Sequence, residues 1–205
     1  MSLVVSNLTI ARGGLRLLEG VSFKVAAGEA LVLRGENGIG KTTLLRTIAG
    51  LQPPVSGQVD VAADTVAYAS HADGIKGQLS VLENLSFWAQ VYGQPPVQAQ
   101  VLEAFDLCRL RDRPAAQLSA GQKRRLGLAR LGVIARRGLL LDEPTVSLDT
   151  ASVARFGEFV GAHLAAGGFA VIATHIELGF ATRVLDLSAF KAVLADLPDF
   201  DEAFL

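Results

Sequence analysis

LRGENGIGKTTLLR, at residues 33–46, separates an apolar segment that favours a strand from one typical of a helix. Its glycines, Gly35, Gly38 and Gly40, allow successive backbone N–H groups to converge on one anion without Cβ atoms in the way. The positive end of the helix dipole would face the same point. A glycine-rich turn that happens to end in Lys-Thr is the alternative. We interpret the stretch as a phosphate-binding loop.

Residues 35–42 match the whole P-loop pattern G-x-x-x-x-G-K-[ST], with the strand before it and the helix after it that the pattern requires. Lys41 would bridge the β- and γ-phosphates of a nucleotide, and the Thr42 hydroxyl would bind Mg²⁺. Thr43 is placed to contact the α-phosphate. The residues expected around the phosphates are Gly35, Glu36, Asn37, Gly38, Ile39, Gly40, Lys41, Thr42 and Thr43.

A second motif, GLLLDEP at residues 138–144, places Asp142 and Glu143 at the end of an apolar strand. A buried strand that ends in acid is costly unless a cation or ligand lies there. Asp142 would hold Mg²⁺ through water, and Glu143 would polarise the attacking water. The alternative is a solvated Asp-Glu turn, which the P-loop upstream disfavours. The two motifs together predict a nucleoside triphosphatase that uses Mg²⁺.

Composition sets limits on the class of protein. The chain has 205 residues, half of them hydrophobic, 19% charged residues and a formal net charge of −1, so disorder and nucleic-acid binding are not indicated. Cys108 is the single cysteine, which suits a reducing compartment. No apolar run reaches the roughly 18 residues that a membrane span needs. We expect a cytosolic protein whose work at a membrane, if any, depends on partners.

Strand-like and helix-like segments alternate along most of the chain, which predicts an α/β fold with a parallel sheet. Residues 80–136 are mostly helical in pattern and interrupt this alternation, with Ser80 as a candidate helix cap. We predict a single domain over 1–205. Its core would span about 1–70 and 137–205, and an inserted helical lobe about 71–136.

Four motifs occur in a fixed order: LSAGQ at 118–122, LLLDEP at 139–144, SLD at 147–149 and ATH at 173–175. Together with the P-loop, they resemble the ATP-binding cassette (ABC) ATPases, from about residue 3 to residue 187. The resemblance implies a P-loop core of mixed sheet and helices with an inserted α-helical lobe. It also implies that two copies form a head-to-tail dimer with two ATP molecules at its interface.

The resemblance assigns roles across that interface. Ser119, Gly121 and Gln122 would begin a helix whose hydroxyl and N–H groups bind the γ-phosphate held by the other copy's P-loop. Read locally, Ser119 is equally consistent with a simple helix cap. Asp149 would reach across to the opposite site. His175 would contact the γ-phosphate and help to hold the catalytic carboxylate and its water.

Two positions depart from the family pattern. His71 stands where most members have a glutamine that senses Mg²⁺. Because imidazole is a poor magnesium ligand, we expect His71 to act by a hydrogen bond or through water; the alternative is a histidine satisfied by backbone. Arg12 replaces the aromatic residue that usually stacks on adenine. A guanidinium can stack on a base, but we expect weak selection between ATP and GTP.

Three further segments are similar to one branch of the family, the ATPase subunits of the haem exporter used in cytochrome c maturation: RGG at 12–14, HADGIKGQLSVLENLSFW at 71–88 and LSAGQKRRLGLARL at 118–131. The likeness implies an integral membrane permease of the CcmB type and further cytochrome c maturation proteins as partners. It also implies ATP-driven release of a haem-loaded chaperone, and a location on the cytoplasmic face of the inner membrane.

Other features allow more than one interpretation. A partner's helix would bind between core and lobe, with apolar candidates Phe87, Trp88, Val91 and Tyr92, although core packing explains these equally well. The basic run KRRLGLAR at 123–130 is interpreted as a solvated helix face. The acidic tail at 190–205 would cap the sheet edge or contact a partner.

Rival functions are also open. A soluble ABC-type assembly factor would lack a membrane partner, whereas the ATPase subunit of another small ABC exporter would keep one. A nucleotide-binding scaffold without turnover is disfavoured by an intact Glu143. Chromosome-type members need long coiled coils between P-loop and signature, and no heptads occur there.

Overall fold

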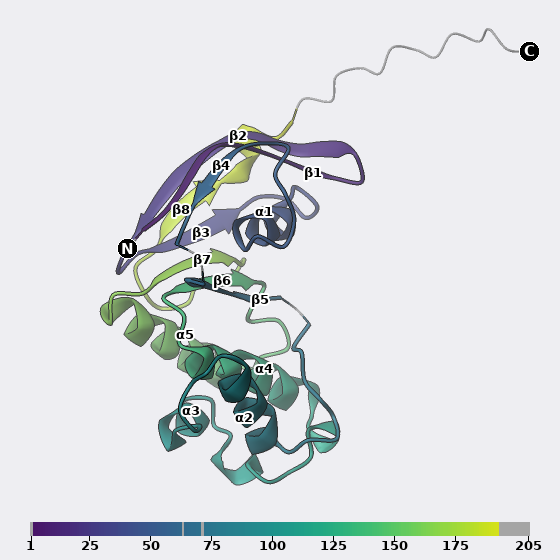
Figure 1. Ribbon diagram of the computed structural model, residues 1–205, viewed down its shortest axis with the longest axis vertical. Helices are drawn as coiled ribbons and strands as arrows, with labels where there is room; N and C mark the ends of the chain where they lie inside the picture. Colours follow the sequence, from purple (N-terminus) through teal and green to yellow (C-terminus); the bar gives the residue numbers. More distant parts are fainter. Residues whose placement is uncertain (1, 63, 71, 193–205) are drawn as a thin grey trace, which may run out of the picture.

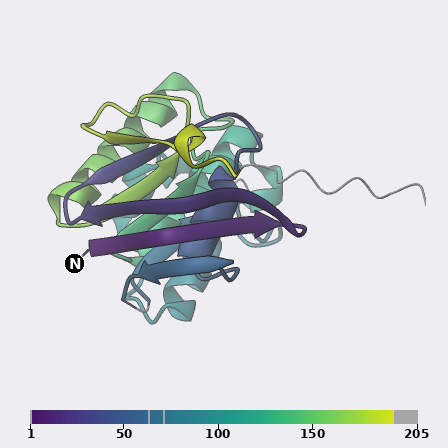
Figure 2. The same ribbon diagram turned by 90° about the horizontal axis from the view of Figure 1, so that it is seen from above.

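The computed structural model describes residues 2–62, 64–70 and 72–192, and their strands form two sheets. The first sheet is antiparallel, in the order β2–β1–β4, with β1 at Ser2–Arg12, β2 at Leu15–Ala26 and β4 at Ser56–Asp60. Figure 1 places it at one end of the molecule, and Figure 2 shows its three strands lying as a layer over the rest.

The second sheet is parallel throughout and has the order β5–β6–β7–β3–β8. Its strands are β3 at Ala30–Arg34, β5 at Val66–Ala69, β6 at Gly138–Asp142, β7 at Phe169–Ala173 and β8 at Arg183–Asp186. Its central strands β6 and β7 are buried along their whole length, as the apolar runs Leu139–Leu141 and Phe169–Ala173 predict. In parallel strands the carboxyl ends share one edge, so the segments that follow β3, β6 and β7 lie close together.

Five α-helices occur among the described residues: α1 at Lys41–Ile48, α2 at Val81–Val91, α3 at Ala99–Ala104, α4 at Ala120–Ile134 and α5 at Thr150–Ala165. Short 3-10 turns occur at Cys108–Leu110, Ala115–Gln117 and Leu187–Phe190. Helices α2, α3 and α4 fall between β5 and β6 in the chain, and Figure 1 shows α2 and α3 at the end opposite the antiparallel sheet. No helix in the described part of the chain combines the length and hydropathy needed to span a membrane.

Alternate side chains of the parallel sheet enter two different hydrophobic clusters. Leu140 and Val171 join the cluster formed with α1 and the antiparallel sheet. Leu139, Leu141 and Ile172 join the opposite cluster, which continues into α2, α4 and α5. The helical segment between β5 and β6 therefore shares its core with one face of the sheet.

Ser80 caps α2 as the sequence predicts. Its Oγ accepts a hydrogen bond from the Glu83 backbone N–H at 3.2 Å, and the Glu83 carboxylate accepts from the Ser80 N–H at 2.7 Å. These bonds lower the pKa of Glu83. The α/β class, the parallel sheet and the helices at 80–136 are confirmed.

Candidate nucleotide and metal site

The loop between β3 and α1 adopts a backbone that side chains oppose. Gly35 has φ +147° and Gly40 has φ +119°, in the region that favours glycine. A Cβ on Gly40 would lie 3.3 Å from the Leu17 Cβ, so the adjoining β2 leaves little room for one. A Cβ on Gly38 would meet nothing within 4 Å, because this part of the loop faces open space. The loop is therefore curved, bare and open on one side.

Lys41 begins α1 and folds back over this loop. Its Nζ donates to the Gly35 carbonyl at 2.7 Å and to the Glu36 carbonyl at 3.2 Å. The residue is 8% exposed, and Nζ lies 3.5 Å from His175 Nε2. The loop carbonyls thus hold an ammonium group beside a histidine from the far end of the sequence.

A cavity of about 270 Å³ opens over the loop. It is lined by Arg12, Leu17, Asn37, Gly38, Gly40, Lys41, Thr42, Thr43, Asp142 and Glu143. Thr42 is exposed, whereas Thr43 is 5% exposed. The structure therefore brings most P-loop residues to one cavity with the two acidic residues that follow β6.

Asp142, at the end of β6, is 3% exposed. The Tyr68 hydroxyl on β5 donates to its Oδ2 at 3.2 Å. Burial raises the pKa of Tyr68 to about 12, with a further contribution from the charge of Asp142, so this hydroxyl keeps its proton at neutral pH. Tyr68 is a site residue that the sequence analysis missed, because pairing of β5 with β6 is invisible in a linear motif.

Glu143 and His175 approach each other from neighbouring strand ends. Glu143 Oε1 lies 3.8 Å from His175 Nε2. Glu143 has φ +46°, a left-handed conformation that costs a non-glycine residue about 1–3 kcal/mol. Its backbone N–H donates to the Ala173 carbonyl at 2.9 Å, which helps to hold that conformation. Lys41, Glu143 and His175 therefore form one cluster beside the cavity.

The signature residues lie elsewhere. Ser119 caps α4: its Oγ accepts from the Gln122 N–H at 3.3 Å, and the Gln122 side chain accepts from the Ser119 N–H at 2.9 Å. A Cβ on Gly121 would lie 3.1 Å from the Ser147 carbonyl, so glycine permits close packing there. None of the three is among the described residues that line the cavity.

Asp149 caps α5 by accepting a hydrogen bond from the Ser152 N–H at 2.7 Å. This backbone bond lowers the pKa of Asp149. Within one chain the carboxylate therefore serves its own helix. Its exposed position leaves the role across an interface as a prediction.

Arg12 ends β1 and lines the cavity together with Leu17. Its guanidinium is exposed, as stacking on a ligand requires. His71 lies outside the described residues, and so does the predicted acidic tail from residue 193 onward.

The interpretation of 123–130 as a solvated face was wrong for Arg124, which is 4% exposed. The side chain makes four hydrogen bonds to the segments after β5 and β6. A usable signal was present in the sequence: helical spacing puts residue 124 on the same face as Leu128 and Leu131, both of them buried.

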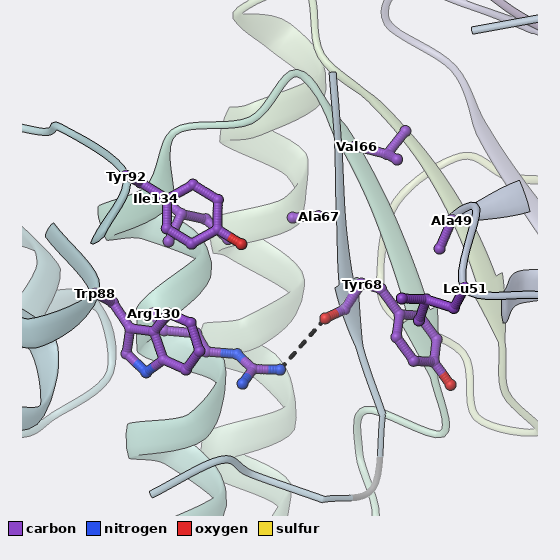
Figure 3. A pocket seen from close by; sticks show the side chains of 9 residues that line it. All are labelled: Ala49, Leu51, Val66, Ala67, Tyr68, Trp88, Tyr92, Arg130 and Ile134. Atoms are coloured by element: carbon purple, nitrogen blue, oxygen red, sulfur yellow. Dashed lines mark hydrogen bonds between the residues drawn. The ribbon is translucent and has the colours of Figure 1, made fainter. Parts of the chain in front are cut away.

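A groove of about 250 Å³ lies between β5, the end of α1 and helices α2 and α4. Trp88 and Tyr92 line it as anticipated, whereas Val91 is 58% exposed and does not. Figure 3 shows Arg130 beside Trp88, with its Nη2 donating to the Tyr68 carbonyl at 3.3 Å. The lining residues are Ala49, Leu51, Val66, Ala67, Tyr68, Trp88, Tyr92, Arg130 and Ile134.

The cavity fits a magnesium nucleotide. The loop is open at Gly38 and holds the Lys41 ammonium group at the cavity, which suits phosphates. Asp142 offers a buried carboxylate close to Thr42, and oxygen ligands are those that Mg²⁺ prefers.

Comparison with known proteins agrees with this chemistry. The family described as "ABC transporter" matches residues 18–146, and the chain belongs to this family. Within it, the chain is 63% identical over 191 residues to "Cytochrome c biogenesis ATP-binding export protein CcmA" of Rhodobacter capsulatus, covering 93% of this chain and 89% of that protein. The protein of the same name from Ruegeria pomeroyi is 57% identical over 205 residues, covering both chains completely. These relatives place the chain in the CcmA group.

Solved structures show the same fold. An ATP-binding protein from Pyrococcus furiosus, described as a putative ABC transporter, superposes with a TM-score of 0.83 at 23% identity, covering 94% of this chain and 100% of that one. A dimeric ATP-binding cassette bound to ADP and Pi, in a post-hydrolysis state, gives a TM-score of 0.78 at 22% identity, covering 90% and 94%. The expected ABC core is confirmed.

Proposed function

We propose that this chain is the ATP-hydrolysing subunit of an ABC exporter that serves cytochrome c biogenesis, and that it drives release of a haem-loaded chaperone. The names of the CcmA relatives support the process. The observation that carries the enzymatic part is the convergence of Lys41, Asp142 and Glu143 at one cavity, with His175 beside Lys41 and Glu143.

The P-loop residues would bind the phosphates. Backbone N–H groups of residues 35–43 would bind phosphate oxygens, and Lys41 would exchange the carbonyls of Gly35 and Glu36 for phosphate oxygens. Thr42 and Asp142 would hold Mg²⁺. When bound, that ion neutralises charge that develops on the phosphates.

Glu143 would orient and polarise the attacking water. Its carboxylate lies beside His175, which would donate a hydrogen bond and keep the carboxylate directed at the γ-phosphate. His71 would also assist catalysis, through a hydrogen bond or a water molecule. Arg12 would stack on the base from the edge of the cavity.

Two copies would share each nucleotide. Ser119, Gly121 and Gln122 do not line the P-loop cavity of their own chain, so their anion site would serve the other copy's γ-phosphate. Asp149 would reach the opposite site. In this arrangement ATP joins the copies head to tail, and hydrolysis separates them.

The groove beside Trp88 and Tyr92 would receive a short helix of an integral permease of the CcmB type. Its aromatic lining with one arginine matches the composition of protein interfaces. Residues 71–136 would act as the lobe that carries this groove. Through the permease, the chain would lie on the cytoplasmic face of the inner membrane, alongside further cytochrome c maturation proteins.

The test combines turnover with partner recovery. The wild-type chain purified from membranes should hydrolyse ATP, and a multispanning protein should co-purify with it. Glu143→Gln should recover the same protein but lower turnover by about a hundredfold or more. Recovery of active enzyme only from soluble extracts, with no integral partner after crosslinking, would favour a soluble assembly factor. An unchanged rate in Glu143→Gln would show that the carboxylate does no catalytic work.

A further inference from the structure

Arg124 on α4 holds the backbone of the catalytic acid. Its Nη2 donates to the Glu143 carbonyl at 2.8 Å, and its Nε donates to the Pro144 carbonyl at 3.0 Å. The side chain is enclosed at 4% exposure, so water competes little for these carbonyls. The edge of the guanidinium formed by Nε and Nη2 therefore binds the segment after β6.

The remaining nitrogen faces the segment after β5. Nη1 donates to the Ser70 carbonyl and to Asp73 Oδ1, both at 2.8 Å. Gly127, one turn further along α4, makes room for this approach, because a Cβ there would lie 2.7 Å from the Asp73 Cβ. A single planar cation thus connects the signature helix, the segment after β5 and the catalytic acid.

Glu143 needs such support. Its left-handed backbone, φ +46°, is unfavourable for a side-chain-bearing residue. The N–H of Glu143 is bonded to Ala173 on β7, and its carbonyl is bonded to Arg124. Loss of the second bond would leave a buried carbonyl unpaired and release that end of the residue.

We propose that Arg124 is a positioning residue for hydrolysis, which fixes the orientation of the Glu143 carboxylate and links it to Ser70 and Asp73. The inference rests on the proposed ATPase function. Ser70 directly follows β5, whose Tyr68 lines the groove. A movement of β5 at the groove would therefore be transmitted to Glu143 through the Arg124 side chain.

Lysine cannot replace this arginine. Four acceptors surround it in different directions: the carbonyls of Ser70, Glu143 and Pro144, and the Asp73 carboxylate. A guanidinium offers fixed donors in one plane, whereas an ammonium group is a compact point charge. Arg124→Lys should therefore keep the charge and the ion pair but lose the bonds to Glu143 and Pro144.

The experiment compares Arg124→Lys and Arg124→Gln with Arg125→Gln in the full chain, purified with its permease. Arg125 is a matched control, since it follows on the same helix and forms an ion pair with Asp106 at 2.5 Å. We expect kcat to fall about tenfold in Arg124→Lys and about a hundredfold in Arg124→Gln, with KM for ATP within about twofold. Arg125→Gln should retain kcat within about threefold of the wild type.

A second readout separates positioning from general stability. In a Glu143→Gln background, Arg124→Lys should cause no additional loss of turnover, because the group that it positions is already gone. Multiplicative loss in the double variant would overturn the proposal, as would wild-type kcat in folded Arg124→Lys. If neither Arg124 variant folds, Asp73→Asn provides the test, because it keeps an acceptor oxygen but removes the ion pair. This variant should lower kcat at constant KM. An unchanged kcat would overturn the proposal.

The experiment distinguishes failure of the proposed ATPase function from failure of the positioning role of Arg124. Absence of turnover in both the wild type and Arg125→Gln would overturn the proposed ATPase function and this inference with it. Normal turnover in the wild type, with equal turnover in Arg124→Lys, would overturn the positioning role alone.

Discussion

The P-loop cavity and the start of α4 are both proposed to bind phosphate. Within one chain, however, the cavity gathers residues from several elements, whereas the capping bonds at the start of α4 stay within that helix. In the cavity, residues that follow β3 and residues at the end of β6 converge, and Lys41 is held by carbonyls of its own loop. At α4, Ser119 and Gln122 satisfy only each other's backbone and face outward. The proposed dimer accounts for this difference: one copy would bind the nucleotide, and the signature of the second copy would complete the site.

Ser119→Asp tests whether the start of α4 binds phosphate. Aspartate is a good helix cap, so α4 should keep its start, but the added charge would face the partner's γ-phosphate. We expect turnover to fall about a hundredfold while nucleotide affinity of the single chain stays within about twofold. Steady-state ATPase assays and nucleotide titration measure the two quantities.

Ser80→Asp provides the matched control, because Ser80 forms the same kind of capping box on α2. It should leave turnover near the wild-type value. Equal turnover in Ser119→Asp and the wild type would remove the signature from the phosphate site and leave it as a helix cap.

Tyr68→Phe tests the completeness of the cavity. Without the hydroxyl, the buried Asp142 carboxylate loses a donor that orients it. Loss of such an outer contact typically costs about tenfold or more in metal affinity, so the Mg²⁺ concentration for half-maximal turnover should rise by about that factor. An unchanged Mg²⁺ titration would contradict the assigned role.

The same bond has a pH signature. The folded pKa of Tyr68, about 12, lies above its ordinary value of 10, so folding favours the protonated hydroxyl. Its contribution to the free energy of unfolding is therefore complete below pH 10 and is lost as pH rises through about 12. Denaturant titrations of the wild type and Tyr68→Phe should converge across that window.

The smallest expected effect concerns the base. With Arg12 in place of an aromatic residue, ATP and GTP should bind within about tenfold of each other, or ~1.4 kcal/mol. Arg12→Ala should weaken both by about threefold, as expected for loss of one exposed stacking contact. Competition titrations check this, and a hundredfold preference for ATP would refute it.

Much of the fold could be predicted from sequence because its signals are local. The P-loop joins a strand to a helix within 33–46, and Asp142 and Glu143 directly follow an apolar strand. Alternation of such segments indicates a parallel sheet, whose strand ends must converge. The meeting of Lys41, Glu143 and His175 follows from that topology.

Arg124 and Tyr68 could not be found in the same way. Their partners lie far along the chain: Ser70 precedes Arg124 by 54 residues, and Tyr68 precedes Asp142 by 74. In a basic run, charge suggests solvent exposure, and only packing of α4 against the segments after β5 and β6 shows that the buried guanidinium is satisfied. Polar contacts between distant elements depend on tertiary geometry.

The cluster that joins α2 and α4 to one face of the parallel sheet has a consequence for unfolding. Leu85 and Leu128 belong to the same apolar contact network as Leu139 and Ile172. Cutting the helices away would expose that face of the sheet to water, and the excised helices would lose the sheet side chains that complete their interior. Denaturant should therefore unfold the chain as one cooperative unit, and probes in the sheet and in the helices should report a single transition.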